Sequence, residues 1–266
     1  MSSKPIGIFD SGVGGLTVLA AIRRLLPHES LIYLGDTARV PYGNKSAETI
    51  LRYAEECCTF LAKKGVKAIV IACNTASAHA LPYIQHRFHF PILGVVEPGV
   101  EEALRVNQSR HIGVIGTFAT IQSEIYAKEL KKRNASVRVS SVSCPLFVPL
   151  VEEDWCDNEV TLAVAEKYLK NLGRDGMDAL ILGCTHYPLL KKVIGECLGP
   201  QIALIDSAEA VAISLQKCLA LSALKASDTF EGAGVELYVT DLTHRFETIA
   251  RRFLEGDIPE VKRVTL

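Results

Sequence analysis

Two cysteines in this chain directly follow apolar segments with the character of buried strands. Cys73 comes after residues 68–72, Cys184 comes after residues 179–183, and polar residues follow each thiol at once. Side chains at the carboxyl end of a parallel strand lie at the edge where open α/β sheets bind ligands. Each thiol also precedes an expected helix start, and a helix N-terminus favours the thiolate form of a cysteine. Both positions are therefore candidates for acid–base chemistry.

A matched pair of thiols suits the inversion of a carbon centre that bears a weakly acidic hydrogen. One group must remove the proton from one face, and a second group must deliver a proton to the opposite face. If Cys73 and Cys184 face one cleft from two related halves, they meet this requirement. Either cysteine alone is explained as well by packing, because free cysteines are commonly buried. The functional interpretation depends on their occurrence in register.

The rest of the chain repeats with a period of about 110 residues. The Ile-Gly pair at residue 6 recurs at residue 112, and the Val-Pro pair at residue 40 recurs at residue 148. One long period indicates a duplicated unit, and strands that alternate with helices predict an α/β fold. We expect two pseudo-symmetric, doubly wound domains with mainly parallel sheets and the active site between them. The first would comprise residues 1–96 and 208–266, and the second residues 97–207.

The expected elements follow from hydrophobic periodicity and from turn residues. Strands are predicted at residues 5–9, 30–34, 66–72, 92–96, 136–142, 179–182, 235–240 and 261–265, with another beginning at residue 112. Helices are predicted at residues 16–26, 46–64, 99–106, 159–172 and 244–254. Glu97-Pro98 is expected to end a strand, because the residue before proline avoids helical geometry. Glu152 is expected in a loop.

Composition excludes several classes of protein. Lys and Arg total 29 against 30 Asp and Glu, so the chain lacks the basic charge of a nucleic-acid binder. No apolar run is long enough for a signal peptide or a membrane span, which predicts a cytoplasmic protein with no membrane partner. The eight cysteines are then expected to be reduced thiols, and Cys57, Cys58, Cys197 and Cys218 to be buried in helices.

Cofactor and metal motifs are missing from the sequence. The segment Asp10-Ser-Gly-Val-Gly-Gly15 has neither the G-x-G-x-x-G spacing of a dinucleotide site nor the ending of a P-loop. No C-x-x-C pair occurs, and Cys184 with His186 has no evident third or fourth ligand for a metal site. We therefore expect neither a cofactor nor a metal.

Polar residues near the thiols have candidate roles of their own. Asp10 ends the first strand, His186 follows Cys184 by two residues, and either side chain could polarise a thiol. The simpler role of Asp10 is a helix or turn cap, and Glu152 could be an exposed acidic residue. Hydroxyl and amide groups that could hold a carboxylate, or cap helices instead, occur at Asn74, Thr75, Thr117, Thr120 and Thr185.

Four motifs together resemble the glutamate racemase family, within the aspartate/glutamate racemase superfamily. They are Asp10-Ser-Gly-Val-Gly-Gly-Leu, Gly35-Asp-Thr-Ala-Arg-Val-Pro-Tyr-Gly, Ala72-Cys-Asn-Thr-Ala-Ser and Gly183-Cys-Thr-His-Tyr-Pro-Leu-Leu. The resemblance spans essentially the whole chain. It implies an isomerase that needs no pyridoxal phosphate and interconverts L- and D-glutamate for peptidoglycan, and hence for cell-wall biogenesis and cell shape.

The resemblance also assigns roles to residues. Cys73 and Cys184 would be the acid–base thiols, with Asp10, His186 and Glu152 assisting proton transfer. The substrate would be bound by Asp10, Ser11, Tyr42, Gly43, Asn74, Thr75, Thr117, Thr120, Thr185 and His186. Related aspartate racemases typically have Thr-Glu after the second cysteine, so Thr185-His186 favours glutamate.

Other functions are compatible with the sequence. The chain could racemise aspartate or a hydantoin, or it could be a two-lobed module that binds a small molecule without turnover. It begins only a few residues before its first strand, so activation by a cell-wall precursor through an N-terminal extension is not expected. A homodimer is an open alternative to a monomer.

Overall fold

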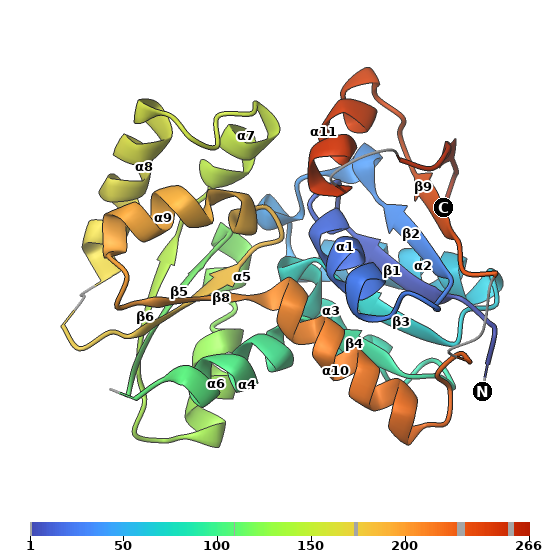
Figure 1. Cartoon of the computed structure of the whole chain (residues 1–266), viewed down its shortest axis with the longest axis horizontal. Helices are drawn as coiled ribbons and strands as arrows, with labels where there is room; N and C mark the ends of the chain where they lie inside the picture. Colours follow the sequence, from blue (N-terminus) through green and yellow to red (C-terminus); the bar gives the residue numbers. More distant parts are fainter. Residues whose placement is uncertain (1, 109, 173–174, 228–231, 255–257) are drawn as a thin grey trace. The chain divides into compact units, whose positions relative to one another are not determined.

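The computed structural model describes residues 2–108, 110–172, 175–227, 232–254 and 258–266. Contacts divide the chain into two compact units. The first unit comprises Met1–Val95 and Ala208–Leu266, and the second comprises Val96–Ser207. Each unit has its own parallel sheet covered by helices (Figure 1).

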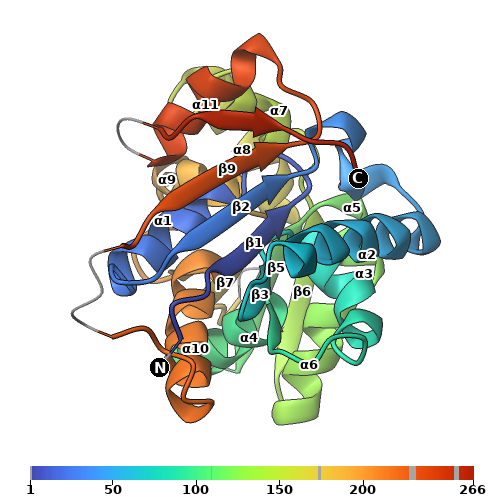
Figure 2. The ribbon, with the colours of Figure 1, turned by 90° about the vertical axis from the view of Figure 1, so that its right-hand side faces the viewer.

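The first unit is built on a six-stranded sheet in the order β10-β9-β2-β1-β3-β4, and every pair of neighbours is parallel. The strands are β1 (Ile6–Asp10), β2 (Leu31–Gly35), β3 (Ala68–Ile71), β4 (Ile92–Gly94), β9 (Val235–Val239) and β10 (Val261–Arg263). Figure 2 shows β9, β2, β1 and β3 side by side. β1 and β3 are buried throughout, as expected for strands covered on both faces.

Helices of the first unit cover both faces of this sheet. They are α1 (Leu16–Leu25), α2 (Ala47–Lys63), α3 (Asn74–Ile84), α10 (Ser207–Leu221) and α11 (His244–Leu254). α1 packs against α11, and α2 packs against α3. Right-handed crossovers place these two pairs on opposite faces, because the chain leaves β1 in one direction along the sheet and leaves β2 in the other.

The second unit has a four-stranded parallel sheet in the order β6-β5-β7-β8. Its strands are β5 (His111–Gly116), β6 (Arg138–Ser143), β7 (Ala179–Gly183) and β8 (Ala203–Asp206). Its helices are α4 (Val96–Val106), α5 (Phe118–Gln122), α6 (Ile125–Arg133), α7 (Phe147–Glu152), α8 (Glu159–Leu169) and α9 (Lys191–Leu198). β6-β5-β7-β8 matches β2-β1-β3-β4 strand for strand, which confirms the predicted α/β class with two parallel sheets.

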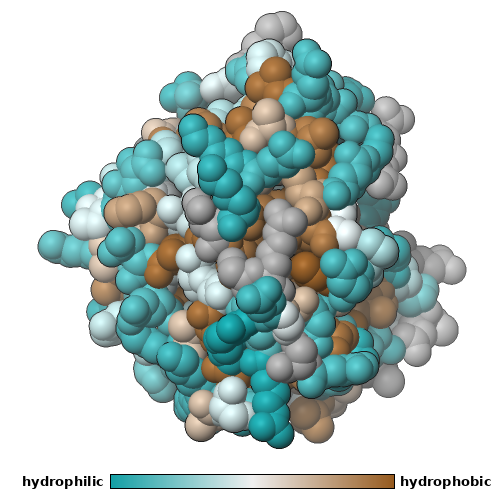
Figure 3. All heavy atoms as spheres, turned by 90° about the vertical axis from the view of Figure 1, so that its left-hand side faces the viewer, coloured by the Kyte–Doolittle hydropathy of each residue, from teal (hydrophilic) through white to brown (hydrophobic). Residues whose placement is uncertain are grey.

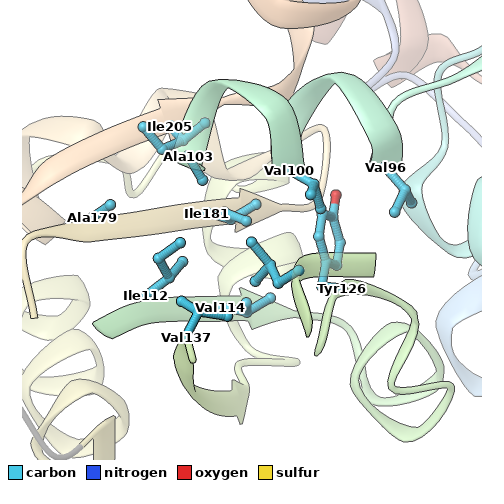
Figure 4. Close-up of a cluster of buried hydrophobic side chains, with 11 residues drawn as sticks. Val96, Val100, Ala103, Ile112, Val114, Tyr126, Val137, Ala179, Ile181 and Ile205 are labelled. Atoms are coloured by element: carbon cyan, nitrogen blue, oxygen red, sulfur yellow. The ribbon is translucent and has the colours of Figure 1, made fainter. Parts of the chain in front are cut away.

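Part of the core of the second unit lies between α4 and the sheet. Val100 of α4, Val114 of β5 and Ile181 of β7 are completely buried and point toward one another (Figure 4). Tyr126 of α6 closes the end of this cluster. Because β7 is held on both sides, the residues that follow it leave the sheet at a fixed place.

Two predictions of local structure are wrong, and both concern a helix that contains a proline near its start. β4 ends at Gly94, and Glu97-Pro98 lies in the first turn of α4 instead of ending the strand. Glu152 is the last residue of α7, a helix, and is not in a loop. Pro98 and Pro149 each occupy the third helical position, where a missing N–H breaks no bond within the helix.

All eight cysteines are free thiols, and Cys57 and Cys58 are buried as predicted. Cys197 and Cys218 are only half-buried, so their prediction is wrong in degree. Among the described residues, no helix has both the length and the apolar character needed to cross a membrane. The face drawn in Figure 3 is mainly hydrophilic, with scattered apolar residues.

Candidate active site

Cys73 lies two residues past the end of β3 and caps α3. Its buried sulfur accepts the N–H of Ala76 at 3.4 Å, so the thiol takes the place that Ser, Thr or Asp usually fills at a helix start. The thiol lies 3.6 Å from Oγ of Ser11, close enough for a hydrogen bond to sulfur. The N–H of Ala76 and the helix start favour negative charge on the sulfur.

Asp10 ends β1, the neighbour of β3, and its side chain is completely buried. Oδ2 accepts the N–H of Gly12 at 2.9 Å, so Asp10 does serve as the turn cap that the sequence suggested. The chain passes very close to this side chain: a Cβ on Gly15 would lie 2.4 Å from Cβ of Asp10. Only glycine fits at position 15, which explains one of the glycines of the first motif.

Tyr33 in β2 is a neighbour of this site that no sequence motif singled out. Its hydroxyl donates to the carbonyl oxygen of Gly12 at 2.7 Å. Burial, the charge of Asp10 and the charge of Cys73 raise the pKa of Tyr33 well above its ordinary value. The phenol therefore stays neutral and fixes the loop that carries Ser11.

The remaining candidates of the first unit are buried at the same sheet edge. Asn74 and Thr75 form the start of α3. Tyr42 and Gly43 begin a short 3-10 turn, Tyr42–Asn44, in the connection that follows β2. The hydroxyl of Tyr42 donates to the carboxylate of Asp36, so this side chain is engaged within the unit.

Cys184 lies one residue past the end of β7, in the position that corresponds to Cys73. Its sulfur is buried and lies 3.9 Å from Nδ1 of His186. The other ring nitrogen of His186, Nε2, lies 3.0 Å from Oε1 of Glu152. The three residues form a chain from carboxylate through imidazole to thiol, an arrangement in which the carboxylate orients the imidazole toward its partner.

The electrostatic environment created by Glu152 and Cys184 favours a positively charged imidazole on His186. Burial lowers the pKa of His186, but its hydrogen bonds to Cys184 and Glu152 and the negative charge of both groups outweigh burial and raise that pKa to about 10. His186 is then a cation at neutral pH, with a donor on each ring nitrogen. A cation in contact with sulfur stabilises a thiolate.

Other residues of the second unit surround the second thiol. Burial and then the charge of Cys184 raise the pKa of Cys144, so Cys144 stays a neutral thiol. Thr117 caps α5 by accepting the N–H of Thr120 at 3.3 Å, and the two hydroxyl oxygens lie 3.0 Å apart. Thr185 is buried directly after Cys184.

The structure thus brings the predicted residues together in two groups. Asp10, Ser11 and Cys73 gather in the first unit, and Glu152, Cys184 and His186 gather in the second. Across the residues that the structure describes, no group of three His, Cys, Asp or Glu side chains is placed to hold a metal ion.

Comparison with known proteins identifies the class. Residues 14–215 match the family described as Asp/Glu/Hydantoin racemase. The match covers most of the chain, so the protein belongs to this racemase family.

Individual relatives are named more narrowly. A glutamate racemase of Geobacter metallireducens is 50% identical over 266 residues, which is 100% of this chain and 98% of the relative. The solved glutamate racemase isoform RacE1 of Bacillus anthracis has a TM-score of 0.95 and 39% identity, and covers 100% of this chain and 99% of its own. The glutamate racemase of Francisella tularensis, solved in complex with D-glutamate, has a TM-score of 0.93 and 37% identity, with 100% and 98% coverage.

Proposed function

We propose that this protein interconverts L- and D-glutamate and so supplies D-glutamate for peptidoglycan. Relatives that match along their full length are named glutamate racemases, which supports the choice of substrate. The observation that carries the mechanism is the pair of buried thiols at corresponding strand ends, each with its own polar partners. An α-hydrogen is removed and replaced, so the reaction needs an acid and a base and no oxidant or reductant.

Proton transfer is assigned to the two thiols. One sulfur, as thiolate, takes the proton from Cα: the C–H bond breaks, an S–H bond forms, and the electron pair stays on the substrate. The other sulfur, as thiol, gives its proton to the opposite face of that carbon and becomes the thiolate. The reverse direction exchanges the roles. The proposal requires Cys73 and Cys184 to face one bound substrate from opposite sides.

The partners of the thiols have supporting roles in this proposal. Asp10 and Ser11 serve Cys73, because the hydroxyl of Ser11 lies against the sulfur and Asp10 fixes the turn that carries it. His186 serves Cys184 as a cation, and Glu152 orients and charges the imidazole.

Substrate binding is assigned to neutral donors at the same edges. Asn74, Thr75 and Thr185 are buried beside the thiols, and Thr117 with Thr120 adds a pair of hydroxyl groups. The hydroxyl of Tyr42 is hydrogen-bonded to Asp36, and Gly43 has no side chain. Tyr42 and Gly43 would therefore contact glutamate through main-chain groups. Such donors can bind carboxylates without a metal or an organic cofactor.

A chiral assay tests this function. Purified protein, dialysed against a chelator and given no cofactor, should convert either pure enantiomer of glutamate to an equal mixture. Aspartate and a 5-substituted hydantoin, run side by side, separate the other activities of the family. Calorimetric binding of glutamate with no change in optical rotation would instead favour the two-lobed binding module, and would contradict the proposal.

Location and assembly are part of the proposal as well. Eight free thiols support a reducing compartment such as the cytoplasm. A homodimer stays a prediction, and light scattering at assay concentrations would check it.

A further inference from the structure

Asp36, at the carboxyl end of β2, has a completely buried carboxylate that several segments share. Oδ1 accepts from Oγ1 of Thr240 at 2.9 Å and from Nε of Arg39 at 2.9 Å. Oδ2 accepts from Nε of Arg39 at 2.7 Å and from the hydroxyl of Tyr42. The N–H of Asp36 donates to the carbonyl oxygen of Asp10 at 3.0 Å. A buried carboxylate needs hydrogen-bond donors of this kind. The network therefore fixes the positions of the segments that supply the donors to Asp36.

Arg39 extends the network to α2. Its guanidinium also pairs with Glu56, and its central carbon lies 4.0 Å from the centre of the Tyr53 ring. That ring in turn lies 5.6 Å from the ring of Tyr42. Burial lowers the pKa of Arg39, but Glu56 and Asp36 raise it above its ordinary value, so the guanidinium stays charged.

The segment after β9 holds the same connection from the other side. The hydroxyl of Thr240 accepts the N–H of Ala38 at 2.9 Å while it donates to Asp36. Thr37 donates its hydroxyl to the carbonyl oxygen of Asp241 at 2.5 Å and accepts the N–H of Asp241 at 2.8 Å. Residues 240–241 thus hold the short turn Thr37–Arg39 in place by hydrogen bonds. This turn precedes the turn Tyr42–Asn44, which carries the proposed substrate-binding pair Tyr42 and Gly43.

Tyr42 transmits this restraint to the turn Tyr42–Asn44. Burial, followed by the charges of Cys57 and Asp36, raises the pKa of Tyr42 far above its ordinary value, so its hydroxyl is a permanent donor to Asp36. We propose that Asp36 and Thr240 are positioning residues, which set the main chain of Tyr42 and Gly43 for substrate through the Tyr42 hydroxyl. The inference rests on the proposed function, in which this pair lines the glutamate site.

Loss of one bond in the network should weaken substrate binding more than chemistry. A displaced turn loses contacts made equally to bound glutamate and to the transition state, so KM rises while kcat changes little. We expect Thr240→Val and Tyr42→Phe each to raise KM about tenfold and to leave kcat within about twofold, the size of effect typical of one buried hydrogen bond. The two enantiomers have equal free energy, so kcat/KM must fall by the same factor in both directions.

Matched variants separate positioning from folding. Thr240→Ser keeps the hydroxyl and should restore the KM of the original protein. Tyr53→Phe removes a hydroxyl from the ring beside Tyr42. Thr59→Val makes the same type of substitution as Thr240→Val, but at a threonine of α2 outside the network. Both controls should keep the original KM. The melting temperature of each variant is recorded, together with calorimetric binding of D-glutamate.

The outcomes distinguish this inference from the proposed function. Higher KM and Kd in Thr240→Val and Tyr42→Phe, restored in Thr240→Ser, would support positioning. Unchanged KM and Kd with a lower melting temperature would show a purely structural role and overturn it, as would a fall in kcat at constant KM. An original protein that binds glutamate without racemising it contradicts the proposed function alone, because Kd still tests the positioning. One that does not bind glutamate contradicts both.

Discussion

The two units place a thiol at the same point of the same strand order and surround it differently. In the first unit, the sulfur of Cys73 has neutral partners: it accepts the N–H of Ala76 and donates to the hydroxyl oxygen of Ser11. In the second, the sulfur of Cys184 meets the imidazole of His186, which is backed by a carboxylate. The repeat therefore preserves the place of the sulfur and leaves its surroundings free to differ.

The comparison distinguishes the position of the sulfur from the stabilisation of its negative charge. The backbone fixes where the sulfur lies, because β3 and β7 are buried strands held between neighbours. Side chains of neighbouring segments then decide how negative charge on the sulfur is stabilised: by dipoles in the first unit and by a cation in the second. Substitutions can test the shared feature and the unshared ones separately.

The largest effect is expected where the units agree. Cys73→Ala and Cys184→Ala should each lower racemisation by at least about 10³-fold, because either loss leaves one face of the carbon without its proton carrier. Chiral separation of the product gives the rate, and circular dichroism checks the fold. Cys218→Ala, at a half-buried thiol of α10, should keep full activity. Either of the first two variants racemising at more than a tenth of the original rate would refute the two-thiol assignment.

The next effect tests whether the units support their thiols independently. Asp10→Asn and His186→Gln should each lower kcat/KM by about tenfold to a hundredfold, less than loss of a thiol. Their double variant should show the product of the two factors, since the two residues serve different sulfurs. His186→Gln with Glu152→Gln should show less than the product, because these side chains share one hydrogen-bonded chain. If both double variants deviate equally from the product of their single effects, the two thiols are not supported independently.

The pH dependence should change only through the second unit. The charged form of His186 is lost as pH rises through its pKa of about 10, so kcat/KM should fall on that alkaline side. Glu152→Gln removes one group that raises this pKa, and the alkaline limb should move to lower pH by about one pH unit, a modest change because Glu152 is partly exposed. For stability the sign is the same: the raised pKa stabilises the fold below about pH 6.5, the unfolded value, and this contribution disappears as pH rises through about 10.

A neighbouring carboxylate provides the control for that experiment. Glu153→Gln removes a negative charge from the exposed residue directly after α7 and should leave the limb in place. If the alkaline fall in kcat/KM stays at the same pH in Glu152→Gln, or shifts equally in both variants, it does not report the titration of His186.

The smallest effect is expected from the neutral support of Cys73. Ser11→Ala removes one hydroxyl at 3.6 Å from the sulfur and leaves the N–H of Ala76 in place. A loss of about threefold to tenfold in kcat/KM is expected, with the pH profile unchanged, since no titrating group is removed. A shift of the alkaline limb in this variant would mean that the two thiols are not supported separately.

Some features were predictable because they depend on local sequence. Apolar runs that end in Cys73 and Cys184 identified the strand ends, and repetition of the pattern indicated two α/β units of the same type. Pro98 misled the prediction at the end of β4, since a proline is tolerated or disruptive according to its position within a helix. That position depends on where the helix starts.

Other features depend on contacts between distant segments. Glu152 and His186 are 34 residues apart, and only the path of α7 brings the carboxylate to the ring. Asp36 and Thr240 are 204 residues apart, and they meet because β9 pairs with β2. Strand neighbours of this kind are set by the whole sheet, so neither bond could be read from spacing.

Racemisation in heavy water tests the two-sulfur mechanism most directly. One enantiomer of glutamate is incubated in deuterium oxide, and both enantiomers are separated at low conversion for mass spectrometry. We predict deuterium at Cα of the newly formed enantiomer from the first turnovers, with hydrogen retained in the remaining substrate, because the delivering thiol exchanges with solvent and the removing thiol is a different group. New enantiomer that keeps the original hydrogen, or equal early labelling of both enantiomers, would contradict it.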